Sequence, residues 1–346
     1  MGVQKEVIIL LSDRQKLILK AIVEEYVSSG EPVGSTSLTK KPYLNFSSAT
    51  LRYDMQNLEE NGYLEKTHTS SGRAPSEKGY RYYVNHLLTR DSDVKSLYKE
   101  IDNILEDKVH SKEEILQAVI NFVSNQTNYY CTMLGSSASF ARVKKMEIVE
   151  LSDKDALLLI VTNSGVVRSQ KITIPDNVKM EDLLRIMSMF DVAMYDQEIY
   201  EIRDVLTKEA MKPRIRQMVD FRDDILNFLI KAFSSFMNTE SYSSGIHRLF
   251  HQAEFQDYQT IQKILKSIDE NKLSECMRKH TKGLNIMIGD ENLDLGLEDC
   301  SIITVPYYLD EDEYGTIALV GPKRMNYKQS VPLMEYLAKS LPKIYK

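Results

Sequence analysis

Residues 47–73, which read SSATLRYDMQNLEENGYLEKTHTSSGR, constrain the fold of this chain more than any other segment. Ser47 is a good helix N-cap, and Gly62 can adopt the left-handed conformation that ends a helix. The apolar residues between them recur at the spacing of one helix face: Leu51, Met55 and Leu58. The segment therefore predicts a helix with one buried stripe, followed at once by a short strand and a basic, glycine-tipped turn.

The opposite face of this helix is polar and suited to contact DNA. Arg52, Tyr53 and Gln56 can bond to base edges or phosphates, and Ala49 can pack on a thymine methyl group. A helix beside a flexible basic hairpin fits a DNA groove and its flanking phosphates. On this segment alone, an ordinary solvated helix face is an equally good interpretation.

The preceding and following residues favour the DNA-binding interpretation. Ser12 and Gln15 form a capping box that opens a helix ending at Gly30, and a short second helix spans residues 35–40. Ser76 can cap a fourth helix. Three helices followed by a strand and a turn is the order of a winged helix-turn-helix. Its turn offers hydroxyls, backbone N–H groups and a guanidinium for phosphate or minor-groove contact.

Four sequence blocks give the chain a family resemblance. They are GEPVGSTSL at 30–38, the block at 47–84, GIHRLFHQAEF at 245–255 and YGTIALVGPKRMNY at 314–327. From about residue 12 to the end, the chain resembles the HrcA family of bacterial heat-inducible transcription repressors. The resemblance implies a homodimer that binds double-stranded DNA at an inverted repeat called CIRCE and represses chaperone operons of the groE and dnaK type. It also implies a dependence on the chaperonin GroEL, with activity lost on heat stress, and no cofactor.

The resemblance further implies an α+β multidomain fold with a winged helix-turn-helix, a GAF-like α/β domain and a mainly helical dimerisation domain inserted into it. Strand patterns at residues 129–172 and 284–320 flank a largely helical stretch, as an insertion would. Sequence order alone leaves open whether the two strand blocks share one sheet. The expected parts are an N-terminal extension 1–11, a winged helix 12–90, GAF-like segments 91–178 and 283–346, and the insert 179–282.

The candidate DNA-binding residues come from the third helix and the hairpin. They are Ser47, Ser48, Ala49, Thr50, Arg52, Tyr53, Gln56, Lys66, His68, Thr69, Ser70, Ser71, Gly72 and Arg73. Tyr53 stands where the family pattern I-R-N-D has Asn, which leaves its contact with a base open. His68 alone is more often a structural or solvated histidine, so it receives no separate chemical role.

The insert is rich in Met and Phe, and a small helical domain has little interior for them. Such residues are more often part of a core than of an interface. A palindromic operator, however, needs two DNA-binding domains and hence a surface that pairs two subunits. The candidate dimerisation residues are Met187, Met189, Phe190, Phe228, Phe233 and Phe236.

The charge and the cysteine content limit which classes of protein this chain can belong to. The chain has 346 residues and a net charge of −6, yet residues 1–90 carry 12 basic and 10 acidic residues, a net of +2. DNA binding would therefore rest on a few placed contacts rather than on a broadly basic surface. Three scattered cysteines without metal-ligand spacing fit small buried residues in a reducing cytoplasm. No apolar run reaches membrane-spanning length.

Two other classes of protein compete with a repressor. An enzyme is disfavoured because the sequence has no phosphate-binding loop, HExxH motif, ligand cluster or nucleophile elbow. The alternative that stays open is a winged-helix regulator controlled by a small molecule bound in the GAF-like domain.

Overall fold

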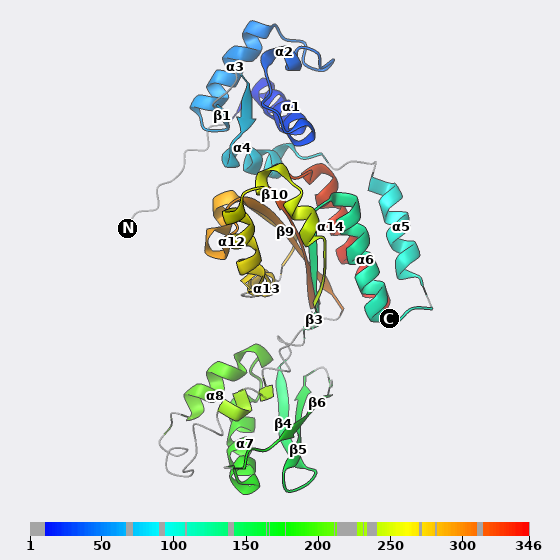
Figure 1. Cartoon of the computed structure of the whole chain (residues 1–346), viewed down its shortest axis with the longest axis vertical. Coiled ribbons are helices and arrows are strands. Elements are labelled where there is room, and N and C mark those ends of the chain that lie inside the picture. The colour runs from blue at the N-terminus through cyan, green and yellow to red at the C-terminus, as the bar shows by residue number, and fades with distance from the viewer. Residues whose placement is uncertain are drawn as a thin grey trace. The chain divides into compact units, whose positions relative to one another are not determined.

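The computed structural model describes most of the chain in two compact units (Figure 1). The described residues are 11–66, 72–89, 94–107, 109–137, 142–163, 165, 167–176, 178–210, 212, 227–230, 232–233, 241–269, 272–280, 282–309 and 314–345. One unit comprises Met1–Met133, Tyr242–Pro306 and Ile317–Lys346, and the other comprises Leu134–Ser241 and Tyr307–Thr316.

Residues 11–89, here called the N-terminal bundle, form a small helical domain with a hairpin. Its elements are α1 (Asp13–Ser29), α2 (Ser35–Leu38), α3 (Ser48–Glu60), β1 (Leu64–Lys66), β2 (Arg73–Pro75), α4 (Glu77–Tyr82) and the π-helical turn η1 (Tyr83–Leu87). The predicted capping box of Ser12 and Gln15 is present, and Gly30 ends α1 with φ 72°. Leu51 and Leu58 are fully buried and Met55 is 4% exposed, which confirms the predicted stripe of α3.

The same unit contains a five-stranded sheet, here called the core sheet. Its strands are β3 (Tyr130–Ser137), β7 (Ser241–Ser244), β8 (Asn285–Ile288), β9 (Cys300–Tyr308) and β10 (Tyr314–Pro322), in the order β7-β3-β10-β9-β8. Every residue of β10 is buried, and so is every residue of β9 except the last. Alternate residues of a strand point to opposite faces, so helices must cover both faces of this sheet.

The helices around the core sheet lie on its two sides (Figure 1). On one side are α5 (Lys95–Leu105), α6 (Lys112–Thr127) and α14 (Tyr327–Ser340), which continues as the 3-10 helix η8 (Leu341–Tyr345). On the other are α12 (Tyr258–Asp269) and α13 (Lys272–Lys279). Shorter helices complete this part: α11 (Ile246–Phe250), η6 (Ala253–Phe255) and η7 (Gly289–Leu295).

The second unit is built on a three-stranded sheet. From here on the name insert refers to this unit and no longer to the expected range 179–282. Strands β4 (Val143–Glu150), β5 (Asp155–Thr162) and β6 (Val167–Thr173) pair antiparallel in that order. The residues of β5 alternate between buried and half-buried, so one face of the sheet packs on helix α7 (Met180–Met194) and the other faces outward. The short helix η4 (Ile199–Glu201) and helix α8 (Ile202–Ala210) follow.

The structure divides the chain differently from the sequence. Strands β4 to β6 belong to the insert rather than to the core sheet, so the insert begins well before residue 179. Residues 242–282, expected in the insert, lie in the unit of the core sheet instead. The two strand blocks do share a sheet, but only β3 of the first block joins it. Strand positions follow from local patterns, whereas strand partners are set by contacts far apart in sequence.

The Met and Phe residues of the insert fill its interior. Met187 is 3% exposed, Phe190 1% and Phe233 0%, and Met189 and Phe228 are partly buried against the same cluster. Phe236 lies outside the described residues. For Met187, Phe190 and Phe233 these burials contradict the expectation of an exposed pairing surface, because a small sheet with one covered face needs a core of this size. The cysteines are buried as expected: Cys131, Cys276 and Cys300.

Candidate nucleic-acid interface

Helix α3 presents a polar face that its capping holds in place. The Ser47 hydroxyl accepts a hydrogen bond from the Thr50 backbone N–H at 3.1 Å and pairs with the Thr50 hydroxyl at 2.9 Å. Ala49, Arg52 and Gln56 are exposed, and Tyr53 is 63% exposed. Ser47 is exposed as well, whereas Ser48 and Thr50 are half-buried. Four of the predicted contact residues thus share one accessible face of α3.

Arg52 is exposed but anchored. Its Nε donates to the Ser35 hydroxyl at 3.1 Å, and the Ser35 and Ser48 hydroxyls are also 3.1 Å apart. Ser35 begins α2, so this chain of contacts connects α2 to the first half of α3. A guanidinium held at Nε keeps its orientation while the rest of its donor fork stays available for bidentate contacts. Ser35 was not among the sequence-predicted residues.

The hairpin is attached to the end of α3 through Glu59. Its carboxylate lies 2.6 Å from Arg73 Nε and 3.6 Å from Lys66 Nζ. The Arg73 side chain is only 13% exposed, whereas that of Lys66 is 64% exposed. The sequence suggests that Arg73 is an exposed contact residue in the turn. In the structure Arg73 instead positions the hairpin against α3. Glu59 thus contacts one residue of each strand of the hairpin, Lys66 of β1 and Arg73 of β2. The helical pattern of α3 alone does not reveal these contacts.

Gly72 is a second correction to the predicted contact set. It is buried, and a Cβ atom at this position would lie 2.8 Å from the Pro32 carbonyl oxygen. Val33 and Arg73 exchange two backbone hydrogen bonds of 2.9 Å, so the chain before α2 pairs with β2. Gly72 thus permits close packing at the base of the hairpin. The remaining predicted residues, His68, Thr69, Ser70 and Ser71, lie outside the described residues.

A groove of about 530 Å³ runs between α3 and the hairpin. Three cationic side chains line it: Arg52, Lys66 and Arg73. The other lining residues are Gly34, Ser35, Thr36, Met55 and Gln56. Four of the sequence-predicted residues are therefore brought together here from α3, β1 and β2. The groove combines positive charge with hydrogen-bonding groups, which suits a phosphate backbone.

Helix α3 is fixed to α1 by a pair of charges that sequence analysis missed. Arg14 Nε donates to Asp54 at 2.6 Å, and Asp54 is only 1% exposed. Asp54 lies three residues after Leu51 and one before Met55, on the buried side of α3. The guanidinium of Arg14 also lies 5.9 Å from the centre of the Phe46 ring. A carboxylate next to an apolar stripe signals such a buried pair, because it needs a partner.

A second ion pair fixes the segment that leads into α3. Lys41 Nζ lies 2.7 Å from Glu25, which also accepts a hydrogen bond from the Ser37 hydroxyl. Partial burial acts to raise the pKa of Glu25, but the hydrogen bonds from Lys41 and Ser37 outweigh it and the pKa is lowered. The carboxylate is therefore charged at neutral pH and ties α1 to α2 and to the loop before α3.

Comparisons with known proteins find relatives that match nearly the whole chain. A model of the HrcA protein C-terminal domain matches residues 113–331. The heat-inducible transcription repressor HrcA of Acholeplasma laidlawii (strain PG-8A) is 40% identical over 337 residues, covering 97% of this chain and 98% of the relative. That of Onion yellows phytoplasma (strain OY-M) is 36% identical over 338 residues, with the same coverage.

A solved structure supports the fold over the whole length. A crystal structure of a hypothetical protein has a TM-score of 0.59 and 21% identity, and the match covers 97% of this chain and 99% of that one. Among the described residues, none of the helices is both long and apolar enough to cross a membrane. Two repressors of the same name align with 97% of this chain at 36% and 40% identity. This chain therefore belongs to the HrcA family of heat-inducible transcription repressors, which are not enzymes.

Proposed function

We propose that this chain represses chaperone operons of the groE and dnaK type by binding a CIRCE-like inverted repeat as a cytoplasmic homodimer. In this proposal α3 lies in the major groove and the N-terminal bundle is a winged helix-turn-helix, with the hairpin as its wing. The single observation that carries the proposal is the exposed polar face of α3 beside the cationic groove. A helix of this kind reads bases while the adjacent strands contact phosphates.

The test is binding to three DNA duplexes measured by fluorescence anisotropy. One duplex carries the inverted repeat, the second a single half-site, and the third a shuffled sequence of equal composition. The proposal expects the full repeat to bind at least tenfold more tightly than the half-site, because linking two binding domains can raise the overall affinity about 10²–10⁴-fold above that of one domain. Equal affinity for the repeat and the shuffled duplex contradicts the proposal.

The surface that pairs two subunits is proposed to be the outward face of the insert's sheet. Leu157, Leu159 and Val161 of β5 are half-buried on that face. Val149, paired with Leu157, is 39% exposed, and Val167, paired with Val161, is 59% exposed. These five apolar residues form a diagonal patch across the three strands, and Glu147 and Ser169 stand opposite Leu159 on either side. An exposed apolar patch is typical of a homodimer interface. The substitution Leu159→Glu should give monomers in light scattering, whereas the exposed loop control Lys154→Glu should leave dimers.

Regulation by GroEL is proposed to act through the folding state of the chain. The apolar cluster of the insert, which includes Phe190 and Phe233, becomes exposed if the insert loosens on heating. Exposed apolar surface of this kind is what a chaperonin binds. After mild heating of the purified chain, GroEL with ATP should restore operator binding, and excess unfolded competitor should block that recovery. Full recovery without a chaperonin contradicts this part of the proposal.

One cavity could hold a small molecule and therefore supports the alternative of a regulator controlled by a ligand. It has a volume of about 550 Å³ and is lined by Arg81, Val84, Asn85, Leu88, Leu284, Asn285, Ile286, Val331 and Glu335. The Asn285 side-chain nitrogen is buried and has no hydrogen-bond partner among the described residues. A thermal-shift screen of metabolites tests this alternative. A saturable shift that disappears in Asn285→Leu supports a ligand sensor, and a screen without any such shift speaks against it.

A further inference from the structure

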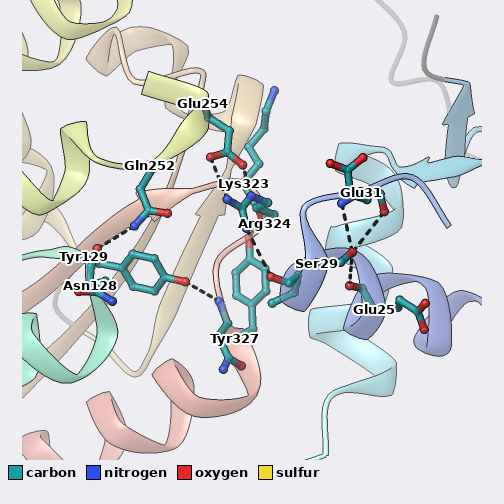
Figure 2. Close-up of polar contacts among 12 residues, drawn as sticks. Glu25, Ser29, Glu31, Asn128, Tyr129, Gln252, Glu254, Lys323, Arg324 and Tyr327 are labelled. Carbon is teal, nitrogen blue, oxygen red and sulfur yellow. Dashed lines mark hydrogen bonds and ion pairs between the residues drawn. The ribbon is translucent and has the colours of Figure 1, made fainter. Parts of the chain in front are cut away.

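Two sequence blocks of the family resemblance, residues 245–255 and 314–327, do not contribute to the groove beside α3. They meet instead at the end of α1 (Figure 2). Arg324, which follows β10, bonds the Glu254 carboxylate through Nε and lies 3.4 Å from it through Nη2. Its Nη1 donates to the Val27 carbonyl oxygen in the last turn of α1 at 3.4 Å. A cation at this position stabilises the unpaired carbonyls and the negative end of the helix dipole.

Lys323, the neighbour of Arg324, bonds the start of α4. Its Nζ lies 3.0 Å from the carboxylate of Glu77, which also accepts a hydrogen bond from the Asp290 backbone N–H at 3.1 Å. Gly289 makes this approach possible because its φ is 59° and a Cβ atom there would lie 2.0 Å from the Glu77 carboxylate. The backbone around η7 is thus shaped to receive a side chain of the N-terminal bundle.

Arg81 supplies the third contact, further along α4. Its guanidinium bonds both carboxylate oxygens of Glu291, with Nε at 3.0 Å, and its Nη2 donates to the Ile286 carbonyl oxygen of β8 at 2.7 Å. The rings of Tyr80 in α4 and Tyr327 in α14 lie 6.1 Å apart, and both residues are buried. The junction therefore combines a buried aromatic contact with ion pairs, and such pairs fix relative orientation more than they add affinity.

The loop that carries Lys323 and Arg324 is itself braced from the core sheet. The hydroxyl of Tyr129, which directly precedes β3, accepts a hydrogen bond from the Asn326 backbone N–H at 2.9 Å. Gln252, close to Glu254, donates to the Asn128 carbonyl oxygen at 3.0 Å (Figure 2). The segments of both partners of the Arg324–Glu254 pair are thus tied to the residues just before β3, so the pair can transmit an orientation to α1.

We propose that Arg324, Lys323 and Arg81, with Glu254, Glu77 and Glu291, form a clasp that fixes the angle between the N-terminal bundle and the core sheet. In a dimer the distance between the two α3 helices depends on this angle. The clasp residues are therefore positioning residues that select the spacing between operator half-sites, since half-site spacing mirrors protein geometry. The proposal rests on the proposed function, because it supposes a dimer that reads an inverted repeat.

The test compares full-length variants on operators whose half-sites are identical and whose spacers differ by one to three base pairs. The parent chain should bind only a narrow range of spacers. Glu254→Gln and Arg324→Lys should each bind the optimal operator about tenfold more weakly, because a looser link lowers the effective concentration of the second head. Their discrimination between spacers should fall, while their affinity for a single half-site stays unchanged. The matched control is Lys263→Ala, which breaks the 2.7 Å pair with Glu298 elsewhere in the same unit.

A measurement without DNA separates failure of the clasp from failure of the proposed function. Spin labels on cysteines introduced at Asp13 in α1 and Lys99 in α5 report the distance between the bundle and the helices of the core sheet. The parent should give one narrow distance distribution, and both clasp variants should broaden it while Lys263→Ala does not. Unchanged spacer profiles together with unchanged distances in both variants overturn the clasp, whatever the parent binds.

Discussion

Arg52 and Arg73 line the same groove, yet the structure predicts different consequences when each is replaced by Ala. Arg52 is exposed and loses one hydrogen bond, that to Ser35, so Arg52→Ala should change the free energy of unfolding by about 1 kcal/mol or less. Its effect on operator binding should be about 1–3 kcal/mol for each half-site. A palindrome uses the residue twice, which gives about 2–6 kcal/mol, or roughly a 30-fold loss of affinity at the lower end.

Arg73→Ala should act mainly through stability. Its side chain is 13% exposed and pairs with Glu59, which is 24% exposed. Removing the guanidinium leaves a largely buried carboxylate with a poorer partner, at a cost of about 1–3 kcal/mol in the free energy of unfolding. The hairpin should then lose its position, and binding should weaken as a secondary effect.

Urea unfolding and salt-dependent DNA binding distinguish the two roles, with Lys99→Ala on α5 as a control for the loss of one positive charge. The reasoning is refuted if Arg52→Ala binds the operator as tightly as the parent at moderate salt. It is also refuted if Arg73→Ala keeps full stability while the slope of log affinity against log salt falls by about one. That second result is the signature of a direct phosphate contact, which is what the sequence alone suggests for Arg73.

Three further predictions concern packing and pH. Gly72→Ala should lower the melting temperature and weaken DNA binding, because its Cβ atom would lie 2.8 Å from the Pro32 carbonyl oxygen; Gly34→Ala, with its closest contact at 3.7 Å, should change the melting temperature less. Phe190→Ala should destabilise the insert by about 3–5 kcal/mol and expose a protease site, whereas Val192→Ala, at 78% exposure, should not. The pKa of Asp102 is lowered by hydrogen bonds from Tyr336 and Lys343. This group therefore stabilises the fold above its unfolded pKa of 3.8 and loses that contribution as pH falls through the lower folded pKa. Urea unfolding should show a smaller loss of stability on acidification in Asp102→Asn than in the parent.

The N-terminal bundle could be predicted closely because its signals are local. Ser12, Ser47 and Ser76 cap helices through their own side chains, and Gly30 and Gly62 end helices through positive φ angles. The apolar stripe of α3 follows from helical spacing. These features depend on residues a few positions apart, which a sequence displays directly.

The parts that sequence analysis missed depend on partners far along the chain. Asp54 reads as one more polar residue of α3 until Arg14, 40 residues earlier, is brought beside it. Arg73 reads as an exposed cation until the hairpin folds back onto Glu59. The strands of the insert were recognised as strands, but only pairing decides that they form a sheet of their own.

The Met and Phe residues of the insert show a further limit. Their helical spacing is the same whether they fill a core or form an interface, so Met187 and Phe190 could not be assigned from pattern alone. Their burial against β4 and β5 decides for the core. The half-buried leucines of β5 then become the better candidates for a pairing surface.

The central claim is that α3 reads an inverted repeat, and footprinting on the chain's own chaperone promoters tests it most directly. Nuclease protection should cover both arms of one inverted repeat, centred on positions that α3 can reach in the major groove. Protection of both arms should disappear together in Arg52→Ala at a protein concentration that saturates the parent. Protection without palindromic symmetry, or a footprint that Arg52→Ala leaves intact, would contradict the account.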